Sequence, residues 1–134
     1  MAINTGIWID SRMAVIIHLS GDNHKVIHLD SLIEKREREE GESKKFGRFG
    51  DQYLSFEKTK RNKQINQAKE FLKHIKLHLK KSDSFVVFGP AQMKIELEKY
   101  LKEDKVLYNK LMSIESADSM TENQLIAWVK GYFS

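Results

Sequence analysis

Residues 84–88 read SFVVF, a short run in which four apolar side chains follow one another without a break. Strict alternation of apolar and polar residues would indicate a strand with one face in water. A continuous apolar run is typical instead of a strand that is buried on both faces. The run therefore predicts an α/β fold in which helices cover both faces of a sheet.

Two further apolar runs stand near the N-terminus, at residues 3–10 and 13–19, and both are rich in β-branched and aromatic side chains. Only two residues separate them, so they must form an antiparallel hairpin. A second turn is expected at residues 21–23. Residues 24–31 alternate well enough to continue the hairpin as the third strand of a meander.

Apolar residues at three- and four-residue spacing predict a long helix over about 57–81. Its buried stripe consists of Ile65, Ala68, Leu72, Ile75 and Leu79. A second helix is expected to follow Gly89 and to run to about residue 102, with Pro90 near its first position, where the missing N–H costs nothing.

A fifth strand is expected within residues 106–115, and a last helix over about 121–132. Thr121 and Gln124 match a capping box at the start of that helix. The element order β-β-β-α-β-α-β-α predicts a ribonuclease-H-like, mixed five-stranded sheet with helices on its faces. A chain of 134 residues is expected to form a single domain over 1–134, with a long mobile basic loop at about 34–56.

Several classes of protein lack support in the sequence. There is no cysteine for a disulfide or a thiolate metal site, and no apolar run approaches the roughly 20 residues that span a bilayer. The first residues do not resemble a signal peptide, so we expect a cytoplasmic protein without a membrane partner. No phosphate-binding loop, dinucleotide fingerprint or nucleophile elbow is present, and no cofactor is expected.

Positive charge is concentrated in one third of the chain. Residues 44–81 hold 12 Lys and Arg against three acidic residues, a local net charge of +9, whereas the rest of the chain has a net charge of −5. Such a concentration indicates a surface for a polyanion. The alternative is a lysine-rich helix face that is simply solvated.

Other chemistries have weaker signals. Asp10 ends the first strand, where ribonuclease-H-like nucleases place a metal-binding carboxylate, but Asp is also a good turn residue there. Gly89 and Pro90 precede a helix whose N-terminus could hold a phosphate, although a plain turn explains them better. His74 and His78 have a zinc-like spacing without a third ligand, so no metal site is expected. The remaining strand histidines are interpreted as structural: His18, His24 and His28.

The segment KKFGRFGDQ combines the features of a phosphate- and RNA-binding loop. Glycines let the backbone approach a ligand closely, Lys and Arg contact phosphates, and aromatic rings can stack on unpaired bases. The phosphate-binding candidates are Lys44, Lys45, Gly47, Arg48, Gly50, Lys58, Lys60, Arg61 and Lys63 in and after this segment, and Lys69, Lys73, Lys76 and Lys80 on the helix.

At this segment the chain resembles the central domain of the archaeal and eukaryotic class I translation termination factor. That domain carries a Gly-Arg-Gly-Gly-Gln loop before a long basic helix, and GRFGDQ stands in the same place here, followed by YLSFEKTKRNKQINQAKEFL. GIWIDSRMAVIIHL and FVVFGPAQMKIEL resemble its strands and a later helix. The resemblance covers roughly residues 6–133 and extends to small bacterial, translational-machinery-like relatives and to Pelota.

The resemblance implies a ribosome- or RNA-associated module of the translation machinery, with the ribosome, rRNA or tRNA as partner. In the termination factor, the loop glutamine helps water attack the peptidyl-tRNA ester, so Gln52 is the catalytic candidate. Asp51 departs from that loop by replacing its second glycine, and Pelota-type relatives do not hydrolyse the ester. Two alternatives stay open: a peptidyl-tRNA ester hydrolase, and an interaction protein that binds no nucleic acid.

Overall fold

The computed structural model describes residues 2–31 and 66–134. The predicted basic loop at about 34–56 and the first part of the predicted long helix lie outside these described residues. The rest of that helix is confirmed, because residues 66–79 are helical. In the described part of the chain, no helix is long and apolar enough to cross a membrane.

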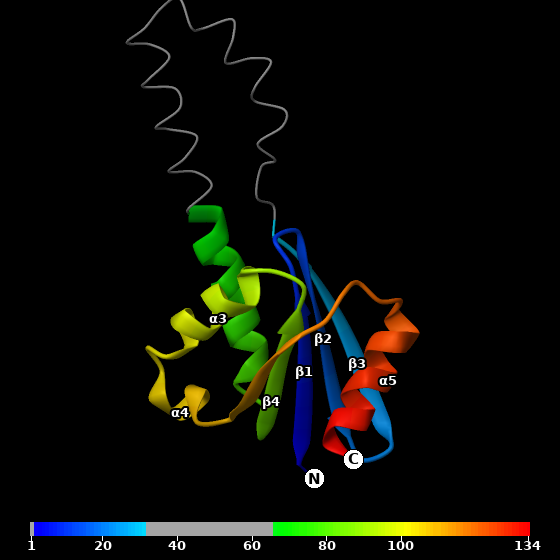
Figure 1. Cartoon of the computed structure of the whole chain (residues 1–134). Coiled ribbons are helices and arrows are strands. Elements are labelled where there is room, and N and C mark those ends of the chain that lie inside the picture. The colour runs from blue at the N-terminus through cyan, green and yellow to red at the C-terminus, as the bar shows by residue number, and fades with distance from the viewer. Residues whose placement is uncertain (1, 32–65) are drawn as a thin grey trace, which may run out of the picture.

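Five strands and four helical segments make up the described structure (Figure 1). The labelled elements are, in chain order, β1 (Ile3–Ile9), β2 (Met13–Ser20), β3 (Asn23–Asp30), β4 (Ser84–Gly89), α3 (Met93–Leu101), α4 (Lys105–Tyr108), β5 (Leu111–Ser116) and α5 (Glu122–Phe133). The helix of residues 66–79, which connects β3 to β4 in the chain order, is called the 66–79 helix below.

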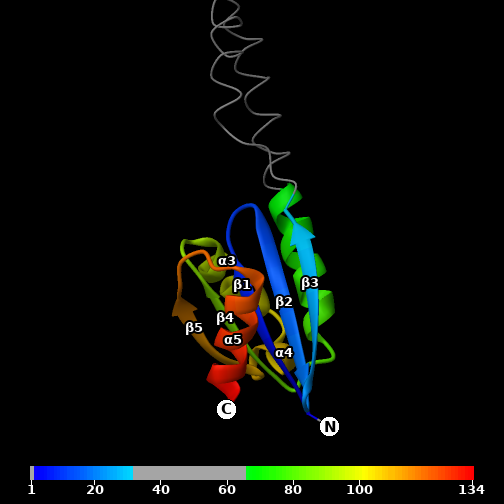
Figure 2. The ribbon, with the colours of Figure 1, turned by 90° about the vertical axis from the view of Figure 1, so that its right-hand side faces the viewer.

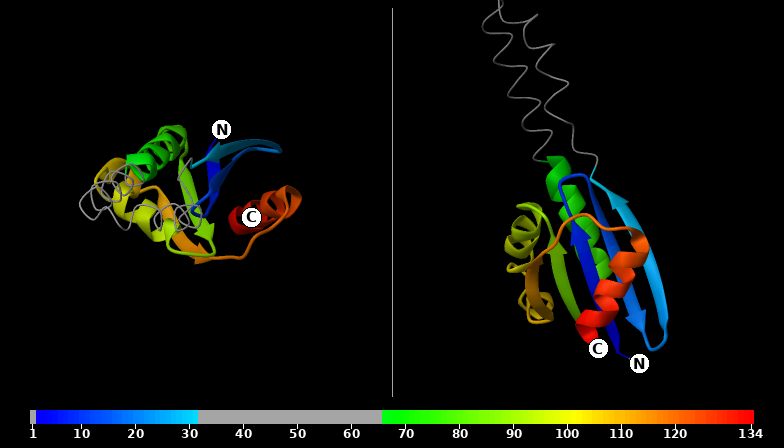
Figure 3. Two further views of the ribbon diagram at one scale, coloured as in Figure 1. Left: turned by 90° about the horizontal axis from the view of Figure 1, so that it is seen from above. Right: turned by 45° about the vertical axis from the view of Figure 1, so that its right-hand side comes forward.

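The strands form one mixed sheet in the order β3-β2-β1-β4-β5. β1 pairs antiparallel with β2 and parallel with β4. β1 therefore joins the antiparallel meander of β1, β2 and β3 to the parallel strands β4 and β5. This arrangement confirms the predicted ribonuclease-H-like, five-stranded mixed sheet. The sheet twists between its two layers of helices, as the two rotated views show (Figures 2 and 3).

Both turns of the meander have a clear chemical cause. Asp10 Oδ1 accepts hydrogen bonds from the backbone N–H groups of Arg12 (2.8 Å) and Met13 (2.9 Å), which closes the first turn. Gly21 has a φ of 61°, a left-handed conformation that glycine adopts without strain, and this permits the two-residue turn between β2 and β3. Asp10 therefore serves the turn, as the turn interpretation of this residue predicted.

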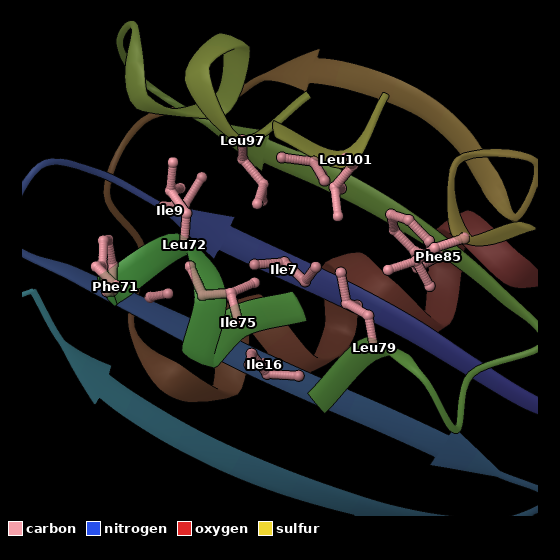
Figure 4. Close-up of a cluster of buried hydrophobic side chains, with 13 residues drawn as sticks. Ile7, Ile9, Ile16, Phe71, Leu72, Ile75, Leu79, Phe85, Leu97 and Leu101 are labelled. Carbon is pink, nitrogen blue, oxygen red and sulfur yellow. The ribbon is translucent and has the colours of Figure 1, made fainter. Parts of the chain in front are cut away.

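The larger core lies on one face of the sheet. Ile7 and Ile9 of β1 and Ile16 of β2 are fully buried beneath Ile75 and Leu79 of the 66–79 helix. Figure 4 shows these side chains pointing toward one another, with Leu97 and Leu101 of α3 closing the cluster. The alternation of strand residues places every second side chain on this face, where the 66–79 helix and α3 bury them together.

A second core lies on the opposite face, under α5 (Figure 3). Phe88 of β4 stacks on Trp128 of α5 with ring centroids 3.8 Å apart, and Trp8 Nε1 donates a hydrogen bond to the Asp118 carbonyl at 3.3 Å. Leu125 and Val129 of α5 complete this cluster. Helices thus cover both faces of the central strands, as the SFVVF run predicted.

The structure corrects one helix boundary and adds one short helix. Pro90 is not near the first helical position, because α3 begins at Met93 with Gln92 as its N-cap. Gly89 has a different role: a Cβ atom there would lie 2.2 Å from the Ile9 carbonyl oxygen, so only glycine fits between the neighbouring strand ends. The short helix α4, which the sequence did not predict, is capped by Asp104, whose side chain accepts from the Leu107 N–H.

Candidate nucleic-acid interface

Three lysines line the solvent face of the 66–79 helix and of the turn that follows it. Lys69, Lys73 and Lys80 are all exposed, and we call them the lysine ridge. Their spacings of four and seven residues place them on one side of a helix with 3.6 residues per turn, over about 16 Å of its length. Leu72 and Leu79, which are buried, fix the opposite side of the helix on the sheet. Core packing therefore holds the ridge outward.

Lys76, which the sequence placed with this group, faces a different neighbour. Its side chain is only 25% exposed, its Nζ lies 3.5 Å from Asp104 Oδ2, and it stands 5.5 Å from the centroid of the Tyr100 ring. The hydrogen bond from the Leu107 N–H, and then the charge of Lys76, hold the pKa of the Asp104 carboxyl below its usual value. Lys76 thus ties the helix to α3 and α4, and its charge is partly neutralised.

Little negative charge opposes the ridge. Glu70 is the single acidic residue between positions 66 and 81, and its carboxylate lies 4.0 Å from the His74 ring. Within the described part of the chain, no carboxylate forms an ion pair with Lys69, Lys73 or Lys80. Among the described residues, the positive charge of the ridge is therefore not neutralised, which suits a phosphate-binding surface.

The other predicted site residues belong to the segment between residues 31 and 66. Those outside the described residues are Lys44, Lys45, Gly47, Arg48, Gly50, Gln52, Lys58, Lys60, Arg61 and Lys63. The end of β3 and the start of the 66–79 helix, between which that segment lies in the chain, are both at the end of the molecule where β1 and β4 finish (Figures 1 and 2). The ridge begins within one helical turn of residue 66.

The described residues give no support to a metal centre. Among residues 2–31 and 66–134, no three His, Asp or Glu side chains are grouped so that they could hold an ion. Asp10 is engaged in its turn, and His74 faces Glu70. His28 Nε2 lies 2.7 Å from Glu122 Oε1, which joins β3 to α5 and agrees with its structural interpretation.

The sequence analysis missed a second cluster of basic side chains, at the other end of the 66–79 helix. His18 of β2 hydrogen bonds through Nδ1 to Thr5 Oγ1 at 2.7 Å, and His78 and Lys81 lie on the adjoining helix end. These residues come from strands and a helix far apart in the chain. A basic residue near the end of a strand or helix does not by itself indicate a binding site. Only the order of the strands in the sheet shows that these basic residues lie close together.

The fold and the ridge define a class: a ribonuclease-H-like α/β domain with a basic helix on one face of its sheet. No protein-family model matches the chain, and no curated protein matches it. Solved structures do share the fold. Archaeoglobus fulgidus Pelota aligns with a TM-score of 0.52 and 14% identity over 96% of this chain and 31% of that chain.

Two more structures align less well. An archaeal translation termination factor has a TM-score of 0.46 and 16% identity, over 98% of this chain and 39% of that chain. A structure described as an archaeal protein has a TM-score of 0.48 and 17% identity, over 97% and 34%. The chain thus spans about a third of the length of these proteins. At these identities the likeness to Pelota shows a shared fold.

Proposed function

We propose that this chain is a ribosome- or RNA-associated module of the translation machinery, and that it binds phosphates through the basic segment 44–64 and the lysine ridge. The observation that carries the proposal is the ridge itself. Its three lysines are exposed on the solvent side of the 66–79 helix and of the turn after it, and none has a carboxylate partner among the described residues: Lys69, Lys73 and Lys80. Lys76 is left out of the binding surface because Asp104 holds it.

Electrostatics favours a polyanionic partner. Binding of a basic surface to RNA releases counterions, so several lysines in a row contribute affinity without reading a sequence. Residues 44–81 carry a local net charge of +9, whereas the rest of the chain has a net charge of −5. This uneven distribution of charge would also orient the module on a polyanionic partner.

The fold gives the proposal its translation context. Archaeoglobus fulgidus Pelota shares this fold with a TM-score of 0.52, and the sequence resemblance described above also extends to Pelota. This chain corresponds to about a third of that protein. Within this module, the lysine ridge is the surface that we propose for contact with the ribosome.

Sedimentation with ribosomes tests the proposal. The tagged full chain is centrifuged with ribosomes from its own cell at low and at moderate salt, and the pellet is assayed for the protein. Phosphate binding predicts co-sedimentation at low salt that declines steeply as salt rises. Free protein at both salt concentrations would contradict the proposal, and salt-insensitive binding would favour an interface between proteins.

A pair of charge variants localises the surface. The first combines Lys69→Glu, Lys73→Glu and Lys80→Glu. The matched control reverses the same number of exposed lysines elsewhere, at Lys99, Lys105 and Lys130. We expect the first variant to lose ribosome binding and the control to keep most of it. Equal losses would show that only net charge matters.

A further inference from the structure

A pocket of about 590 Å³ opens between the sheet and the end of the 66–79 helix. It lies where β1 begins and where β2 turns into β3, at the end of the molecule that carries the N-terminus (Figure 1). Its apolar wall is formed by Ile3, Ile27 and Leu77. Leu77 is 52% exposed although it is large and apolar. The volume is in the range of pockets that hold small molecules.

The polar lining of this pocket is basic. Lys25 and His24 come from β3, His18 from β2, and His78 and Lys81 from the end of the 66–79 helix. No Asp or Glu lines the pocket among the described residues. The carboxylate of Asp83 accepts a hydrogen bond from the Ile3 N–H at 2.6 Å and is not among the residues that line the pocket. A positive charge on these groups thus has no counter-charge in the pocket wall.

His18 is held in place by a buried hydroxyl pair. Its Nδ1 is hydrogen bonded to Thr5 Oγ1 at 2.7 Å, and Thr5 Oγ1 is hydrogen bonded in turn to Ser82 Oγ. Thr5 and Ser82 are essentially fully buried, which fixes the ring, and among the described residues no hydrogen bond engages the second ring nitrogen, Nε2. Burial, with the neighbouring positive charges of His78, Lys25 and Lys81, lowers the pKa of His18.

We propose that this pocket binds a small phosphomonoester with an apolar or planar moiety, such as a nucleoside monophosphate. The phosphate would meet Lys25 and Lys81, and the moiety would lie on the apolar wall of Ile27 and Leu77. Lysines are point charges that suit phosphate, whereas a carboxylate is best held by the planar fork of arginine, which is absent from the lining. His18 adds a hydrogen-bond donor that becomes charged when an anion raises its pKa.

The pocket is separate from the proposed RNA surface. None of the three ridge residues lines the pocket. The ridge reaches this end of the helix only through Lys80, which is exposed and precedes the pocket residue Lys81. The ligand of the pocket can therefore be tested on a protein whose ridge is intact, and failure here leaves the ribosome proposal standing.

Adenosine monophosphate is the probe, titrated into the ¹⁵N-labelled full chain at pH 7 and followed by backbone amide shifts. Inorganic phosphate and uncharged adenosine are titrated in parallel. We expect saturable shifts at millimolar nucleotide, clustered at Ile3, Ser20, Lys25 and Ser82, and weaker binding of either fragment alone. The His18 imidazole should also titrate at a higher pH when the nucleotide is bound.

The variant Lys25→Glu/Lys81→Glu is expected to weaken nucleotide binding by about tenfold or more, because two charge-assisted contacts become repulsive. Lys99→Glu/Lys105→Glu makes the same change of net charge away from the pocket and should keep the affinity. Absence of saturable nucleotide shifts at the pocket, or unchanged affinity in the pocket variant, would overturn the proposal. Adenosine or phosphate alone binding as tightly as the nucleotide would also overturn it.

Discussion

A Cβ atom on Gly6 would lie 2.3 Å from Cγ2 of Val129 and 2.9 Å from its Cγ1. α5 crosses the sheet at this glycine, so its valine side chain occupies the space where any other residue would place its first carbon. The close approach explains how α5 packs flat on β1, with Val129 fully buried. Gly6 is therefore a packing residue, although its place inside a strand would otherwise weaken that strand.

The variant Gly6→Ala should destabilise the protein by about 1–3 kcal/mol, the usual range for overpacking a filled core. The added methyl group must push Val129 and with it the whole of α5. Urea unfolding monitored by tryptophan fluorescence measures the change, since Trp8 and Trp128 both lie in this core. The double variant Gly6→Ala/Val129→Ala should lose less than the sum of the two single changes.

Gly131 provides the control for that experiment. It lies within α5, and a Cβ atom there would meet nothing within 4 Å. Gly131→Ala should therefore stabilise the protein slightly, by about 0.5–1 kcal/mol from helix propensity. A Gly6→Ala variant as stable as Gly131→Ala would contradict the packing of α5 on β1.

The capping box at the start of α5 leads to a second stability prediction. Thr121 Oγ1 accepts from the Gln124 N–H at 3.2 Å, and Gln124 Oε1 accepts from the Thr121 N–H at 2.9 Å. Thr121→Ala should cost about 1 kcal/mol because the Gln124 N–H loses its acceptor, whereas the bond from the backbone N–H of residue 121 to Gln124 Oε1 does not depend on the hydroxyl. Thr121→Ser, which keeps the hydroxyl, should cost much less, as thermal unfolding of the two variants would show.

Local patterns account for most of the fold. The SFVVF run, the hairpin spacing and the capping box each express a rule that acts over a few residues, and all three were confirmed. The errors come from contacts between distant residues. Gly89 was assigned to the entry of a helix, whereas the carbonyl of Ile9 on a neighbouring strand determines its identity. No local pattern contains that information.

In the candidate site, too, local spacing was informative, whereas contacts between distant residues could not be predicted. The spacing of Lys69, Lys73 and Lys80 was enough to predict one exposed face. The same spacing does not reveal that Lys76 is only 25% exposed, because its partner Asp104 lies 28 residues further along the chain. The basic pocket around His18 was missed for a related reason, since three strands and a helix end contribute its lining.

Lys76 and Lys73 are accordingly expected to differ in their effects on RNA binding. Lys73→Ala should weaken the binding of single-stranded RNA, because an exposed lysine contacts phosphate. Lys76→Ala should weaken it less, since its charge is shared with Asp104, but should cost more thermal stability. Fluorescence anisotropy with a labelled RNA and thermal unfolding of both variants would check the two trends. The opposite order in either measurement would contradict the assigned roles.

The titration of His18 leads to a prediction about pH. Its pKa in the folded protein lies below 6.5, first because of burial and then because of His78, Lys25 and Lys81. The unfolded chain then binds more protons, so this group lowers the free energy of unfolding as pH falls from 6.5 to the folded pKa. Below the folded pKa its contribution stays constant.

The variant His18→Asn should flatten that part of the stability curve, while its amide can still reach Thr5. Urea unfolding at several pH values between about 5 and 7.5 gives the slope for both proteins. An NMR titration of the imidazole gives the pKa directly. A His18 pKa above 6.5, or identical slopes in the two proteins, would show that the burial of this ring is wrongly described.

The salt dependence of RNA affinity tests the central claim most directly. The affinity of the wild-type chain for a single-stranded RNA is measured over a series of salt concentrations and compared with that of Lys69→Glu/Lys73→Glu/Lys80→Glu. Each phosphate contact contributes about 0.7 to the slope of log affinity against log salt. The account predicts a slope smaller by about 2 in the variant, together with a large loss of affinity at low salt. Identical slopes and affinities for the two proteins would contradict it.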